Sequence, residues 1–196
     1  MRILALADKA DEQLWEHLDR RLLENVDLVL ACGDLPAEYL RFLVCFTKAP
    51  VLYVHGNHDE RYDKNVPEGC ECIDGKVYVH NGVRILGLGG SYRYRNGKYM
   101  YNEKQMRRRI RKLRFQLWRH KGFDVLVTHA PARHINDFES FSHRGFECFL
   151  SLLERYKPKY FVHGHIHKNY GIDIPQVTVR GETTIINAYD HCEFDY

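Results

Sequence analysis

Short apolar runs alternate with amphipathic segments over the first half of the chain. Residues 2–7 are apolar, and residues 11–24 then carry leucines at helical spacing. The same succession recurs, because the apolar run 27–31 is followed by a helical segment over 36–48 and by a second apolar run at 51–54. Strands that alternate with helices in this way form parallel sheets with crossover helices. The pattern therefore predicts an α/β fold.

The second half of the chain adds a hairpin and a long basic helix. Residues 76–80 and 83–88 are β-rich and flank Asn81-Gly82, a strong hairpin signal. Residues 103–120 have one apolar face and a strongly basic remainder, which predicts an amphipathic helix. The other predicted elements are loops over 60–75 and 89–102, strands over 124–128 and 159–162, a helix over 145–156, and antiparallel strands within 171–187. No linker divides the chain, so we expect residues 1–196 to form a single domain.

Composition restricts the class of protein. The chain has 44% hydrophobic and 28% charged residues, close to the averages of globular domains, which excludes an intrinsically disordered chain. No apolar run approaches the ~18 residues of a bilayer-spanning helix, and residues 2–7 are too short for the apolar region of a signal peptide. The six cysteines are too few for a disulfide scaffold. We therefore expect a cytoplasmic protein with reduced thiols and no membrane partner.

Charge is distributed unevenly along the chain. The net charge is only +3, but residues 93–121 hold 12 of the 29 basic residues and one of the 26 acids. Tyr92, Tyr94, Tyr99 and Tyr101 lie in or beside this basic stretch. Residues 89–121 are therefore predicted to form a basic, aromatic, lid-like segment that attracts a phosphate-bearing substrate. A solvated helix face and a nucleic-acid surface are alternatives, although the acidic remainder of the chain disfavours a dedicated nucleic-acid binder.

Five of the predicted strands end in polar residues. These are Asp8, Asp34, Asn57 with His58, His129, and His165 with His167. Any one of these residues could simply be a turn residue at the end of a strand. In open α/β folds, however, ligands bind at the carboxyl ends of the strands, and all of these residues would converge there. Two carboxylates, an amide and imidazoles, with no thiolate, suit Mn²⁺, Fe²⁺ or Zn²⁺. The sequence therefore predicts a catalytic metal site rather than a structural zinc site.

The order of these motifs resembles that of the calcineurin-like metallophosphoesterases. The matching segments are Asp8-Lys9-Ala10, Gly33-Asp34, Gly56-Asn57-His58-Asp59, Thr128-His129-Ala130-Pro131 and Gly164-His165-Ile166-His167. The resemblance implies a four-layer αββα sandwich of two mixed β-sheets flanked by helices, with two divalent metal ions at the strand ends, Mn²⁺ being favoured over Fe²⁺ and Zn²⁺. It implies that Asp8 and His167 bind the first metal, that Asn57, His129 and His165 bind the second, and that Asp34 bridges both. It makes His58 the catalytic imidazole, which Asp59 would orient unless Asp59 caps a helix instead.

One motif position departs from the family pattern. Ala10 stands where the family has a histidine ligand of the first metal, and a methyl group cannot bind a metal. Three hypotheses follow: a binuclear enzyme with a labile first metal, a mononuclear enzyme, or a degenerate scaffold without catalysis. Lys9 or Asp11 could compensate, electrostatically or as a ligand. Because the other motif positions are retained, a working enzyme is favoured.

These observations favour a metal-dependent phosphoesterase that uses hydroxide held by the metals to hydrolyse a phosphomonoester or phosphodiester of a small metabolite or nucleotide. The expected substrate-binding residues are Tyr92, Arg93, Arg95 and His143. The rival functions are a non-catalytic metal-binding scaffold for protein partners and a nucleic-acid-processing phosphodiesterase. The sequence does not specify an oligomeric state.

Overall fold

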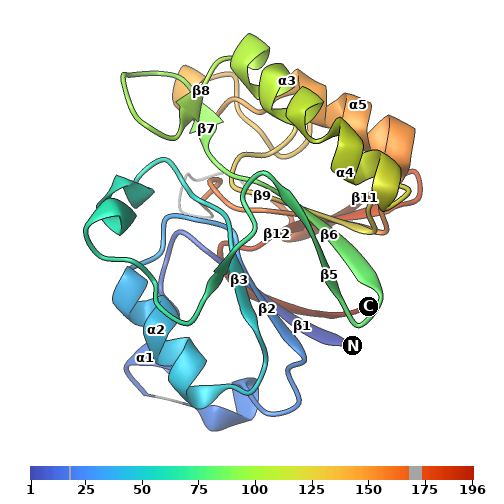
Figure 1. Ribbon diagram of the computed structural model, residues 1–196. Helices are drawn as coiled ribbons and strands as arrows, with labels where there is room; N and C mark the ends of the chain where they lie inside the picture. The colour runs from blue at the N-terminus through green and yellow to red at the C-terminus, as the bar shows by residue number, and fades with distance from the viewer. Residues whose placement is uncertain (18, 168–173) are drawn as a thin grey trace.

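Two β-sheets form the centre of the computed structural model, which describes residues 1–17, 19–167 and 174–196 (Figure 1). The first sheet contains β1 (Arg2–Ala7), β2 (Leu28–Ala31), β3 (Val51–Tyr53), β4 (Glu71–Cys72) and β13 (Asp190–Asp195). Their order across the sheet is β13-β1-β2-β3-β4. Strands β1 to β4 are parallel, whereas β13 pairs antiparallel with β1 along one edge. The carboxyl ends of β1, β2 and β3 consequently lie at one end of the sheet.

The second sheet has six strands. They are β5 (Lys76–His80), β6 (Val83–Leu88), β9 (Val125–Thr128), β10 (Tyr160–His163), β11 (Val177–Arg180) and β12 (Thr183–Asn187). The order is β11-β12-β10-β9-β6-β5, and only the two edge strands run antiparallel to their neighbours. A separate parallel pair is formed by β7 (Ser91–Tyr92) and β8 (Met100–Tyr101).

Helices cover the outer face of each sheet (Figure 1). The first sheet carries α1 (Glu12–Trp15) and α2 (Ala37–Phe46), and the second carries α3 (Glu103–Lys112), α4 (Arg114–Arg119) and α5 (Glu147–Tyr156). Successive residues of β1 serve two layers: Ile3 packs between the sheets, whereas Leu4 packs in the cluster that contains buried residues of α1 and α2. The predicted four-layer αββα sandwich is confirmed. No helix in the described part of the chain is long and apolar enough to cross a membrane.

The predicted helix over residues 11–24 is wrong. The structure has only α1 there, followed by a separate 3-10 helix at Arg20–Leu22. Two aspartates account for the interruption, because each caps the beginning of a separate helix. The Asp11 carboxylate accepts from Leu14 N, and the Asp19 carboxylate accepts from Arg21 N. The predicted helix over 103–120 is likewise divided into α3 and α4.

The hairpin is confirmed, and other segments contain more structure than predicted. Strands β5 and β6 pair antiparallel around Asn81 and Gly82, both of which have positive φ. Residues 89–102, predicted as an exposed loop, contain β7 and β8 and bury Tyr99. Strands β11 and β12 pair antiparallel in the second sheet as expected, although residues 171–173 lie outside the described residues. The last strand, β13, was not predicted and joins the first sheet.

Candidate metal centre

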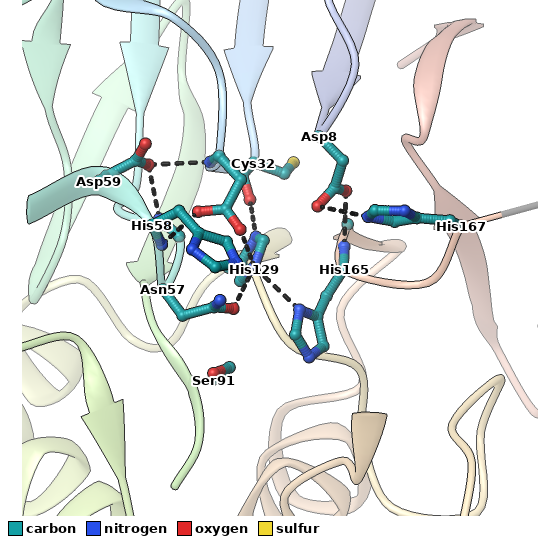
Figure 2. Close-up of polar contacts among 12 residues, drawn as sticks. Asp8, Cys32, Asn57, His58, Asp59, Ser91, His129, His165 and His167 are labelled. Carbon is teal, nitrogen blue, oxygen red and sulfur yellow. Dashed lines mark hydrogen bonds and ion pairs between the residues drawn. The ribbon is translucent and has the colours of Figure 1, made fainter. Parts of the chain in front are cut away.

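The polar residues at the strand ends come together where strands of both sheets end (Figure 2). Asp8, Asp34 and Asn57 follow strands of the first sheet, and His129 and His165 follow β9 and β10 of the second. All of them except the fully buried His129 border a cavity of about 300 Å³. Its lining residues are Asp8, Asp34, Asn57, His58, Arg61, Tyr94, Ser142, His143, His165 and His167. The convergence predicted from the motifs is therefore present in the fold.

Donor atoms meet most closely around His129. Its Nε2 lies 3.1 Å from Asn57 Oδ1, 3.1 Å from His165 Nδ1 and 3.3 Å from Asp34 Oδ2. We call Asn57, His129 and His165 the second-metal side, because the family pattern gives them to the second metal. All three are almost completely buried, His129 with 0% exposure. Nitrogen and oxygen donors gathered at this spacing fit a divalent metal ion of intermediate hardness.

Backbone carbonyls fix the orientation of both imidazoles on this side. His129 Nδ1 lies 2.8 Å from the Cys32 carbonyl oxygen, and His165 Nε2 lies 2.6 Å from the Ser142 carbonyl oxygen. A ring nitrogen facing a carbonyl must donate its proton, which leaves the opposite nitrogen as the one that can bind a metal. In both residues that opposite nitrogen faces the shared donor cluster. The arrangement is preorganised for metal binding.

The titration behaviour of the cluster reflects burial and close charges. Burial lowers the pKa of His165, and the neighbouring charge of His129 lowers it further, to about 3. Burial also acts to lower the pKa of His129, but the charge and hydrogen bond of Asp34 outweigh it and raise that pKa to about 9. Burial opposes ionisation of Asp34, yet the charge of His129 keeps its pKa well below the usual range. A carboxylate is thus available between the two sides.

The other side of the centre is sparser. We call Asp8 and His167 the first-metal side; Asp8 Oδ1 lies 3.4 Å from His167 Nε2, and the His167 side chain is 38% exposed. The other Asp8 oxygen accepts a 2.7 Å hydrogen bond from the His165 backbone N–H. Ala10 packs against the hydrophobic cluster beneath α1 and contributes no donor. Asp8, Asp34, His129 and His165 nevertheless offer ligand atoms that all lie within 4.8 Å of one another.

Neither neighbour of Ala10 replaces the missing ligand. The Asp11 oxygens are engaged by Leu14 N at 2.9 Å and by His191 Nδ1 at 2.6 Å, and Lys9 Nζ pairs with Glu12 at 3.3 Å. Asp11, Asp190 and His191 form a cluster of their own. Both side chains considered as substitutes are thus engaged by other partners.

Strained backbone and close glycines hold the ligands in place. Asp8, Asp34 and His165 have φ of 66°, 60° and 69°, a left-handed conformation that is uncommon outside glycine. A Cβ on Gly56 would lie 2.1 Å from Asp34 Oδ1, and one on Gly164 would lie 2.8 Å from Asp8 Oδ2. The motif glycines are thus required because the carboxylates occupy the space that a side chain would fill.

His58 and Asp59 have separate surroundings. The exposed His58 ring lines the cavity, and its Nδ1 lies 3.4 Å from an Arg95 guanidinium nitrogen. The backbone N–H of His58 donates a hydrogen bond of 2.7 Å to Asp34 Oδ1. The fully buried Asp59 instead accepts from the Gly56 and Asp34 backbone N–H groups at 2.7 and 2.8 Å. Among the contacts described, none joins its carboxylate to the His58 ring, and the residue that caps the 3-10 helix at Asp59–Asp63 is His58. Asp59 therefore ties two ligand-bearing loops together.

The expected substrate-binding residues divide into two groups. His143 lines the cavity, and Arg95 reaches His58 at its edge. Arg93 instead donates to the Met100 carbonyl oxygen at 3.1 Å, within the β7–β8 segment. Tyr92 packs against Phe146 and under the Arg144 guanidinium. The structure thus does not bring Tyr92 and Arg93 to the cavity, because local packing turns both side chains away.

Arg61 and Tyr94 line the cavity in their place. Tyr94 belongs to the aromatic set noted in the sequence, but nothing in the spacing distinguishes it from Tyr92. Arg61 lies in a charged segment with no recognisable signal, and only the 3-10 helix after His58 carries it to the cavity. Its guanidinium lies 3.5 Å from Asp59 Oδ1.

Comparison with known proteins agrees with this geometry. The profile of the calcineurin-like phosphoesterase family matches residues 1–169, so the chain belongs to that family. The fold is shared with TT1561 of Thermus thermophilus, with a TM-score of 0.65 at 16% identity over 96% of this chain and 89% of that one. It is also shared with a 5'-nucleotidase from Candida albicans, with a TM-score of 0.56 at 15% identity; the match covers 95% of this chain and 44% of the nucleotidase chain. Fold and family define a metal-dependent phosphoesterase domain.

Two similar curated proteins come from Caenorhabditis elegans. UPF0046 protein C25E10.12 is 33% identical over 61% of this chain and 41% of its own length. UPF0046 protein K07C11.7 is 28% identical over 88% of this chain and 66% of its own length. The chain therefore spans less than two thirds of each of these relatives.

Proposed function

We propose that this protein hydrolyses a phosphomonoester or phosphodiester of a small metabolite or nucleotide in a metal-dependent reaction. The observation that carries the proposal is the group of donors from Asp34, Asn57, His129 and His165, preorganised at the edge of a cavity of about 300 Å³. The cavity suits a small anionic substrate better than a macromolecule. Residues 1–196 would act as one phosphoesterase domain, with residues 94–95 of the lid-like segment beside the cavity.

The donor sets support two ions of unequal affinity. Asn57, His129 and His165 would hold the second metal, Asp8 and His167 the first, and Asp34 both. Divalent ions there would activate water near neutral pH and neutralise charge on the phosphoryl oxygens. Mn²⁺ suits this mixture of carboxylate, amide and imidazole ligands, as do Fe²⁺ and Zn²⁺. Ala10 leaves the first metal with three protein ligands and hence more labile.

The cavity residues outside the ligand set have distinct roles in this proposal. The Arg95 guanidinium faces His58 Nδ1, so that a neutral His58 ring carries its proton on Nε2, where it can pass to the leaving oxygen of the ester. Arg61 in the cavity wall and Arg95 beside His58 provide positive charge for the phosphoryl group. Tyr94 offers a ring against which a base or sugar can stack. Asp59 acts as a positioning residue, through the loops that carry Asp34 and Asn57.

The test uses metal-stripped protein titrated separately with Mn²⁺, Fe²⁺, Zn²⁺ and Mg²⁺. Turnover of p-nitrophenyl phosphate and bis-p-nitrophenyl phosphate is followed while bound metal is counted. We expect saturable, metal-restored hydrolysis by the wild type and by His17→Gln, a control at an exposed histidine. A folded, metal-loaded protein that hydrolyses neither these esters nor a panel of nucleotides would contradict the proposal and favour the scaffold.

A further inference from the structure

The outer surface of α3 and α4 carries positive charge, most of which has no ion-pair partner among the described residues. Between Glu103 and Lys121 the chain has nine basic residues and one acid, a local net charge of +8. Arg107 pairs with Glu103, and Arg109 pairs with Asp74. Among the described ion pairs, none involves Arg108, Arg111, Lys112, Arg114, Arg119 or Lys121.

This surface is hollowed rather than flat. A depression of about 490 Å³ is lined by Arg108, Arg111, Lys112, Arg114 and Phe115. A second, of about 650 Å³, contains Arg114, Trp118, Arg119, Lys121, Arg155 and Tyr156. Both include Arg114 and therefore adjoin one another. We call the two together the basic groove.

Two aromatic rings stand out of the basic groove into solvent. The exposed fractions of Phe115 and Trp118 are 67% and 74%, although both rings are large and apolar. They lie three residues apart on one face of α4, with ring centroids 5.8 Å apart and ring planes inclined by 35°. Exposed rings beside guanidinium groups that form no ion pair in the described part of the chain match a ligand that carries both flat rings and negative charge.

The basic groove is distinct from the metal centre. The cavity lies at the carboxyl ends of β9 and β10, whereas Trp118 and Lys121 precede β9, and Arg155 and Tyr156 precede β10. These residues are therefore near the opposite ends of the same strands. A ligand bound in the groove would contact side chains that have no part in the proposed hydrolysis.

We propose that the basic groove binds single-stranded nucleic acid. Backbone phosphates contact the arginines, and bases stack on Phe115 and Trp118, a combination that needs no particular base sequence. An anionic membrane also attracts basic and aromatic residues, but it presents a plane, whereas these guanidinium groups line depressions that a winding single strand can enter. The chain-wide charge of +3 does not oppose this, because the acidic residues lie elsewhere.

The experiment measures fluorescence anisotropy of a labelled oligo(dT) of about 20 nucleotides, longer than a typical single-strand site, with the 196-residue chain over a series of salt concentrations. We expect wild-type affinity to fall as salt rises, with a slope of about −0.7 for each phosphate contacted. Arg111→Gln/Arg114→Gln should weaken binding and reduce the slope by about 1 to 1.5. Phe115→Ala/Trp118→Ala should weaken binding roughly tenfold or more with little change of slope, because only stacking is lost.

The matched control is Lys48→Gln/Lys64→Gln, which removes two exposed charges outside the basic groove and should change the affinity little. Circular dichroism and hydrolysis of bis-p-nitrophenyl phosphate should be the same for all three variants as for the wild type, which separates this proposal from the proposed function. Equal weakening in the control and in the groove variants would overturn the proposal. Binding to phosphatidylserine vesicles without binding to the oligonucleotide would overturn it in favour of a membrane surface.

Discussion

The two sides of the metal centre differ in how firmly the protein holds their ligands. On the second-metal side, each imidazole is buried and backed by a main-chain carbonyl, so its metal-binding nitrogen is fixed before any metal arrives. On the first-metal side, His167 is 38% exposed and Ala10 supplies no ligand. The comparison teaches that the lack of a ligand at position 10 need not disturb the second-metal side, because main-chain carbonyls hold its imidazoles independently of that position.

The largest expected effect comes from His129. His129→Ala removes the atom on which Asn57, Asp34 and His165 converge, so bound metal and turnover should both fall to the level of the metal-stripped protein. The measurements are metal content by mass spectrometry and hydrolysis of bis-p-nitrophenyl phosphate. Full activity in this variant would show that the second-metal side is not the essential one.

A smaller effect is expected at His58, which lines the cavity but is not a ligand. His58→Gln should lower kcat by about 10²–10⁴-fold while leaving the metal content unchanged, because only proton transfer is impaired. The loss should be greatest for esters with poor leaving groups, which need a proton most. An unchanged rate with such an ester would remove His58 from the mechanism.

The pH dependence of metal affinity should distinguish the two imidazoles of the second-metal side. His129 has a pKa of about 9, so in the metal-free protein it is protonated at neutral pH and must lose that proton to bind a metal. His165 has a pKa of about 3 and is already neutral at that pH. Affinity should therefore rise about tenfold per pH unit from neutral pH up to the pKa of His129 and then level off. Calorimetry in buffers of different ionisation enthalpy should detect about one proton released per metal at neutral pH. Binding without proton release would contradict this assignment.

The smallest predicted change is an increase in the affinity for the first metal. Ala10→His restores a nitrogen donor to the first-metal side and should tighten the first metal roughly tenfold or more, the scale on which single supporting groups act. Ala10→Leu is the control, since it adds bulk without a donor. Equilibrium dialysis with Mn²⁺ measures both; equal stoichiometry and affinity in the two variants would mean that position 10 does not face the metal.

The sequence predicted the fold and the convergence of the candidate ligands because both depend on features that are local along the chain. Asp8, Asp34 and His165 each follow an apolar strand directly or after a short turn, and parallel strands bring their carboxyl ends together. Where packing against another segment directs a side chain, the sequence carried no such information. Tyr92 faces Phe146 rather than the cavity, and Arg93 faces the Met100 carbonyl.

Boundaries between elements were less predictable for a related reason. Leucine spacing suggested a continuous helix over residues 11–24, but hydrogen bonds to the Asp11 and Asp19 carboxylates from nearby backbone N–H groups favour two short turns instead. Strand β13 was missed because His191, Cys192 and Glu193 lack the apolar alternation of a typical strand. Its position depends on pairing with β1, at the far end of the sequence.

That pairing has a consequence for how the protein acquires its structure. Arg2 lies opposite Asp195, and Ala7, the residue before Asp8, lies opposite Asp190. Contacts between residues so distant in sequence form slowly, because a very long loop must close first. The first sheet therefore cannot be complete until the last strand has docked. During refolding, the first-metal side should reach its native structure in the slowest kinetic phase.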